Sequence, residues 1–160
     1  MKRLFNRVIN NFPLVAILIA LGLTAISVAD GAELAPTLLL NLLVWCVGGS
    51  MLGGATGHLL MGPQVAKGIG WPAGSPFQRE LGFFSLGLGV AGVLANSFDE
   101  TYWLALIIVY SVFMLGAGFG HVYERFANQH KAKYNAGFIL YTDIIVPLVL
   151  IGLYWYVYGI

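Results

Sequence analysis

Five long apolar segments, separated by short polar turns, constrain the fold of this 160-residue chain more than any other feature. Hydrophobic residues make up 59% of the chain and charged residues 9%, against roughly 45–50% and 25% in ordinary soluble domains. A soluble domain of this size could not bury so much apolar surface, whereas a lipid bilayer would cover it. We therefore predict an all-α membrane bundle that forms one domain over residues 1–160, with spans at about 12–29, 36–62, 76–96, 101–125 and 136–158.

The charged residues predict the orientation of these spans. All eight Lys and Arg lie at the N-terminus or around the loops after the second and fourth spans. The opposite loops carry only acids, namely Asp30, Glu33, Asp99 and Glu100. The positive-inside rule then places the N-terminus in the cytoplasm and the C-terminus outside. The basic start and apolar first segment would also fit a secretory signal, but about 18 apolar residues favour a retained span.

The boundaries of the second and third spans carry local signals. Pro63 is expected to end the second span, and a loop is expected from residue 64 to residue 74. Ser75 is expected to cap the third span, with Pro76 at its first position and Gln78 completing a capping box.

An eight-residue motif occurs twice, at the end of the second span and again near the end of the fourth. Residues 51–58 read Met-Leu-Gly-Gly-Ala-Thr-Gly-His, and residues 114–121 read Met-Leu-Gly-Ala-Gly-Phe-Gly-His. The following spans also match, since Gly82-Phe83 opens one and Gly137-Phe138 opens the other. We therefore predict a parallel internal duplication, in which spans two and three and spans four and five form equivalent hairpins.

Small residues in both copies predict close helix contacts. Gly53 and Gly57, like Gly116 and Gly120, are four residues apart and so share a helix face. Such faces are expected to pack helices together, either within the chain, in a homo-oligomer or against a larger membrane complex.

Ionisable residues inside the spans give the candidate site. His58 and His121 end the two motifs, and Glu80 and Asp143 lie in the spans that follow them. Asp143 is the strongest single candidate, because it is seven residues inside its span and an ionisable group at such depth normally faces the bundle interior. We expect the four side chains to gather in the cytoplasmic half. Histidines that only fix the helix ends are the alternative.

The sequence leaves three functions open. The first is transport or proton and ion handling at the His and carboxylate residues. The second is haem or copper binding by the two histidines, with methionine as a further ligand; its metal-ligand candidates are His58, His121, Met51 and Met114. The third is a structural or assembly subunit of a membrane complex. An enzyme is less supported, since no nucleophile–base pattern occurs, and a net charge of +1 gives no reason to expect nucleic acid.

Several segments together resemble a family of small bacterial membrane proteins of unknown function. They are Gly57-His58, the segment Gly-Trp-Pro-Ala-Gly-Ser-Pro-Phe-Gln-Arg-Glu at residues 70–80, Gly120-His121, and Asn135-Ala136-Gly137 with Asp143. The helical layout is also distantly similar to the DoxX-like proteins. The resemblance implies a compact helical bundle in the bacterial inner membrane, and it implies no activity.

Overall fold

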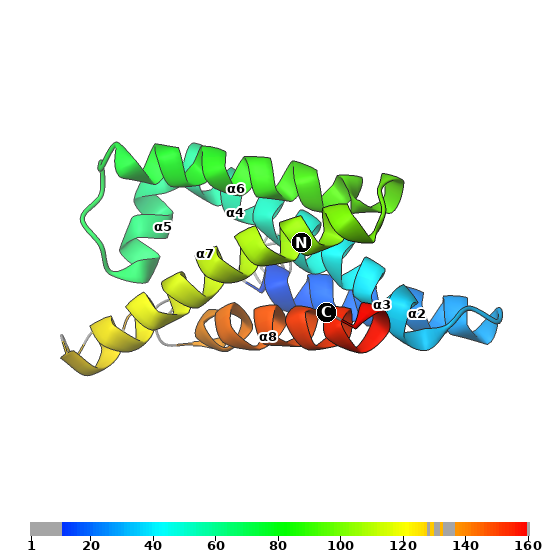
Figure 1. Ribbon diagram of the computed structural model, residues 1–160. Coiled ribbons are helices and arrows are strands. Elements are labelled where there is room, and N and C mark those ends of the chain that lie inside the picture. The colour runs from blue at the N-terminus through cyan, green and yellow to red at the C-terminus, as the bar shows by residue number, and fades with distance from the viewer. Residues whose placement is uncertain (1–10, 128, 130–131, 133–136, 160) are drawn as a thin grey trace.

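The fold is all-helical wherever it is described. The structure, a computed structural model, describes residues 11–127, 129, 132 and 137–159. In chain order its elements (Figure 1) are α2 (Phe12–Ala29), α3 (Leu34–Leu42), the π-helical η1 (Leu43–Gly49), α4 (Ser50–Leu60), α5 (Gly62–Ile69), α6 (Phe77–Leu94), the 3₁₀-helical η2 (Ala95–Ser97), α7 (Glu100–Ala127) and α8 (Phe138–Tyr158).

Five helices are long and apolar enough to cross a membrane, which confirms the predicted fold class. They run over Phe12–Ala29, Leu34–Leu60, Phe77–Ser97, Glu100–Ala127 and Phe138–Tyr158. The second is a continuous run of α3, η1 and α4. The basic segment at residues 1–7 and the expected start of the fifth span at residue 136 lie outside the described residues. The orientation and the internal duplication stay predictions.

The helices pack as two hairpins with α2 at the side. In the first hairpin η1 and α4 pack against α6, and in the second α7 packs against α8. The hairpins meet mainly where α3 contacts α8, whereas α6 and α7 touch much less. Figure 1 shows α7 crossing between the two layers. The fully buried side chains of the common core include Leu39, Leu43, Val47, Ile107 and Leu150.

Glycine brings the two helices of the first hairpin into backbone contact. A Cβ added to Gly92 would meet the Gly48 amide nitrogen and would lie 2.6 Å from the Gly48 Cα. One turn away, a Cβ at Gly89 would lie 2.8 Å from the Leu52 amide nitrogen. Helices approach this closely only where side chains are absent, as in small-residue contacts between membrane helices. Gly48 lies in the π-helical segment, a form of helix that is rare and usually a single turn.

The segment between α4 and α6 corrects two sequence predictions. The second span ends at Leu60. A short helix, α5, takes the place of the first part of the expected loop, and Pro63 lies in its first turn. Proline suits that position because its missing N–H has no partner there in any case. The expected capping box is also wrong, because α6 has no side-chain cap and Gln78 Nε2 instead donates to the Gly62 carbonyl at 2.7 Å.

At the opposite end of the bundle, side chains fix the turn between α6 and α7. Asp99 Oδ1 accepts hydrogen bonds from the amides of Thr101 (3.2 Å) and Tyr102 (3.3 Å), and so caps α7. The Trp103 indole donates to the Ala95 carbonyl at 2.8 Å, and the Tyr154 hydroxyl donates to the Glu100 carbonyl at 3.0 Å. The second hairpin is thereby tied to the turn that joins it to the first.

Asp99→Ala is expected to lower the free energy of unfolding by about 1 kcal/mol, the usual cost of removing an N-cap side chain. The loss should be visible in reversible unfolding by a denaturing detergent, followed by circular dichroism. Asp30→Ala is the matched control, because Asp30 is an exposed acid in the neighbouring turn with no side-chain hydrogen bond within the described residues. Equal effects of the two changes would show that the cap contributes nothing.

Candidate functional site

An ionisable pair, a half-buried histidine and a buried aspartate, joins α7 to α8. His121 Nε2 lies 3.5 Å from Asp143 Oδ2, and the two side chains are 14% and 4% exposed. The sequence predicted both residues as site members, and the structure brings these two together. In a bundle of this hydrophobicity a buried carboxyl group is costly unless another polar or charged group faces it.

The pair depends on a close approach of the two helices at Gly118. A Cβ at Gly118 would lie 3.0 Å from Ile144 Cγ1 and 3.5 Å from the Asp143 Cβ. Gly118 and His121 are three residues apart, so they share the face of α7 that meets α8. Even the methyl group of alanine at this position would require the Ile144 side chain to shift, and that side chain is next to Asp143.

Pro147 changes the backbone at Asp143. In a regular helix the amide of residue 147 would donate to the carbonyl of residue 143, but proline has no N–H. Pro147 lies inside α8 and is fully buried. The Asp143 carbonyl therefore lacks its usual intrahelical donor, and residue 143 offers a backbone acceptor as well as a carboxyl group.

Two further buried groups, which sequence reasoning missed, lie deeper in the bundle. Tyr110 lies on α7, is 2% exposed and belongs to the same buried core as Cys46. Cys46 is itself buried in the π-helical segment η1. The sequence carried a signal for Tyr110, because residues 110, 114, 118 and 121 follow a helical spacing of four, four and three.

The other two predicted site residues lie elsewhere. His58 is in the last turn of α4, where its Cβ faces Gly82 of α6, and its Nδ1 is buried with no hydrogen-bond partner in the described part of the chain. Glu80 is exposed in the first turn of α6. The helix that carries His58 packs on α6, whereas the helix that carries His121 packs on α8. The expected gathering of four side chains is therefore reduced to one pair.

Of the proposed metal ligands, His58 and His121 belong to different hairpins. Met51 and Met114 are both buried in the hydrophobic core. Among the described residues no group of three or more His, Cys, Asp and Glu side chains could hold a metal ion. Haem or copper binding stays an untested prediction.

The four glycines predicted to pack helices differ from one another. A Cβ at Gly53 would meet the Phe12 ring at 2.9 Å, and one at Gly57 would meet Val65 Cγ2 at 3.2 Å. A Cβ at Gly116 or Gly120 would meet nothing within 4 Å. In the second motif Gly118 is the residue that packs against a helix of this chain.

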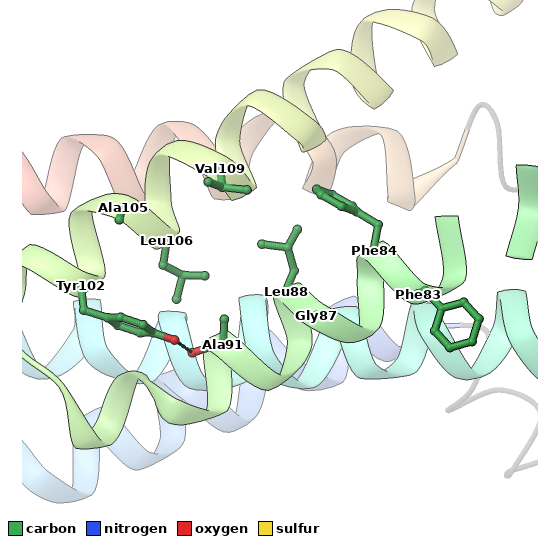
Figure 2. A pocket seen from close by; sticks show the side chains of 9 residues that line it. All are labelled: Phe83, Phe84, Gly87, Leu88, Ala91, Tyr102, Ala105, Leu106 and Val109. Carbon is green, nitrogen blue, oxygen red and sulfur yellow. Dashed lines mark hydrogen bonds between the residues drawn. The ribbon is translucent and has the colours of Figure 1, made fainter. Parts of the chain in front are cut away.

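An apolar cleft of about 500 Å³ separates α6 from α7 (Figure 2). Figure 2 shows Phe84 and Leu88 of α6 facing Leu106 and Val109 of α7 across it. The Tyr102 hydroxyl donates to the Ala91 carbonyl at 2.8 Å at one end. At the other end Phe84 stacks edge-on against Phe113, with ring centroids 4.8 Å apart. The lining offers no acid, base or nucleophile beyond this bonded tyrosine, so the cleft marks a loose seam between the hairpins.

Comparison with known proteins gives one match. No curated protein and no solved structure shows significant similarity to the chain. The model of a family of unknown function, DUF6790, matches residues 9–159. That family assignment agrees with the resemblance seen in the sequence, while the distant likeness to DoxX-like proteins stays a prediction. The chain therefore belongs to the family of unknown function DUF6790.

Proposed function

We propose that this chain is a five-span transport protein of a bacterial inner membrane, and that it binds and releases protons at the His121–Asp143 pair. The observation that carries the proposal is the pair itself, held 3.5 Å apart between two helices that are apolar enough to cross a membrane. Ionisable residues inside membrane helices are rare, and they mark proton relays and substrate paths. Imidazole suits this role because it gains and loses a proton near neutral pH.

The exposures of the two side chains suggest an order of events. His121 is the more exposed partner, and it lies six residues before the end of α7, so it can exchange protons with the aqueous side. A proton on His121 Nε2 then passes to Asp143 Oδ2, which leaves a neutral imidazole and a neutral carboxylic acid. A separation of 3.5 Å exceeds the range of about 2.7–3.2 Å for an N–H···O hydrogen bond. Transfer thus requires a small approach of α8 or a bridging water.

The seam between the hairpins supports a transport role. Duplicated hairpins that rock against each other around a central site are a common plan among membrane transporters. In this chain α6 and α7 touch at the two ends of an apolar cleft, so they can part with little loss of packing. In this proposal, protonation of Asp143 removes a buried charge on α8. The loss of this charge changes how strongly the second hairpin packs against the first.

Proton flux in liposomes tests this proposal. We expect the protein, reconstituted with a pH-sensitive dye inside, to pass protons when a potassium diffusion potential is applied. Asp143→Asn should reduce this flux to that of protein-free liposomes, because the amide cannot accept the proton, and Asp143→Glu should retain part of it. Asp30→Asn is the matched control, since Asp30 is an exposed acid outside the helices. Unchanged flux in a folded Asp143→Asn protein would contradict the proposal.

A further inference from the structure

The short helix α5 is held across the end of the bundle instead of extending α4. Figure 1 shows it turning away from the long axis of α4 and α6. Gln78 of α6 anchors its start through the Gly62 carbonyl, and Val65 packs against Gly57 of α4. Ala66 is 2% exposed, so this face of α5 packs against the bundle.

The residues that the structure describes leave the other face of α5 uncovered. Gln64 and Lys67, three residues apart on α5, are both exposed. The helix then ends at Gly70, whose φ of +89° is left-handed, and the amides of Gly70 and Trp71 both donate to the Ala66 carbonyl, at 2.8 and 2.9 Å. Trp71, the first residue after this turn, is 47% exposed.

The charges of the described residues differ between the two ends of the bundle. The end with α5 carries Lys67, Arg79 and Arg125 against Glu80 and Glu124, a sum of three positive and two negative charges, or +1. The two turns at the other end carry only four acids, a sum of −4: Asp30, Glu33, Asp99 and Glu100. An anionic surface would therefore attract the α5 end and repel the opposite end.

We propose that α5 lies in the headgroup layer of the membrane and binds anionic phospholipid headgroups through Lys67, with Trp71 as its interfacial anchor. Tryptophan is enriched at this level of the bilayer, and basic residues next to spans attract anionic lipid. Anionic lipid is the partner that fits this surface, because the α5 end is positively charged and α5 is held in place at the end of the membrane bundle. The inference rests on the membrane-spanning arrangement proposed above, and it does not depend on proton handling at His121 and Asp143.

Lipid preference in nanodiscs tests this binding. The protein is placed in equimolar phosphatidylcholine and phosphatidylglycerol, and the lipids retained after partial delipidation are counted by native mass spectrometry. We expect the natural protein to retain phosphatidylglycerol preferentially. Lys67→Gln should lower that preference by about fivefold, the effect of one basic residue near an anionic surface, while Lys67→Arg should keep it. Raising the salt concentration should weaken the preference, because exposed charges are screened.

Two results would overturn the proposal. The first is an equal lipid preference of the natural protein and Lys67→Gln, with both folded by circular dichroism. The second is a change in the dimer fraction on Lys67→Gln at constant lipid composition, because the exposed face of α5 would then bind a second copy. Neither result uses a proton gradient, so failure here is separable from failure of the proton-handling proposal. Failure of the protein to enter nanodiscs would contradict the membrane-spanning arrangement itself.

Discussion

Gly92→Ala is expected to destabilise the bundle by about 1–3 kcal/mol, although it adds a single methyl group. The added carbon would lie 2.6 Å from the Gly48 Cα and 3.0 Å from the Val47 carbonyl carbon. Both are backbone atoms, so no side chain can rotate aside, and α6 must move away from η1. That movement would also loosen the contact of Gly89 with Leu52. Reversible unfolding in mixed detergent, followed by circular dichroism, measures the loss.

Gly87→Ala is the control for this change, because it is the same substitution five residues earlier on α6. A Cβ at Gly87 meets nothing within 4 Å, and the residue lines the cleft shown in Figure 2. Alanine has a better helix propensity than glycine by up to about 1 kcal/mol, so this variant should be neutral or more stable. Equal losses at the two positions would show that backbone contact at Gly92 does not limit stability.

His121→Leu is expected to cost about 3–5 kcal/mol of stability, because it leaves the Asp143 carboxyl group buried without the imidazole that faces it. Replacing both residues by leucine should restore most of the loss, since an apolar pair of similar volume carries no desolvation penalty. The double-mutant cycle of His121→Leu and Asp143→Leu, measured by unfolding in mixed detergent, gives the coupling between the two side chains. Additive losses would mean that the pair is not coupled, and they would remove the basis of the proton-handling proposal.

The sequence was enough to predict the five spans, because apolar segments of this length are limited by membrane thickness and not by packing detail. Predicted ends at residues 29 and 158 coincide with Ala29 and Tyr158. The predictions around Pro63 and Ser75 are wrong for two reasons. Proline at a helix start and proline after a helix end look alike in sequence. Gln78 donates to the Gly62 carbonyl of another segment, a contact that no local pattern reveals.

The candidate site could be predicted only in part. Depth in the span predicted that Asp143 faces the bundle interior, and in the structure His121 Nε2 lies 3.5 Å from it. The repeated motif suggested an equal role for His58, but helix contacts assign each histidine to its own hairpin. Among the described residues, an acid faces the histidine of the second hairpin and none faces His58. The contact glycine Gly118 lies two residues from both Gly116 and Gly120, so it is on the opposite side of the helix from the predicted pair, and the packing of α7 on α8 selects it.

The contact of Gly48 with Gly92 has a mechanical consequence for the whole bundle. Side chains yield by changing rotamer, whereas two backbones in direct contact have nothing to rearrange. The hairpin of α4 and α6 should therefore behave as the stationary frame of the molecule. The seam beside it is held by the Tyr102–Ala91 hydrogen bond and the Phe84–Phe113 ring contact, one at each end. We expect α7 to move against this frame at the seam, so the helix that carries His121 is also the helix that moves.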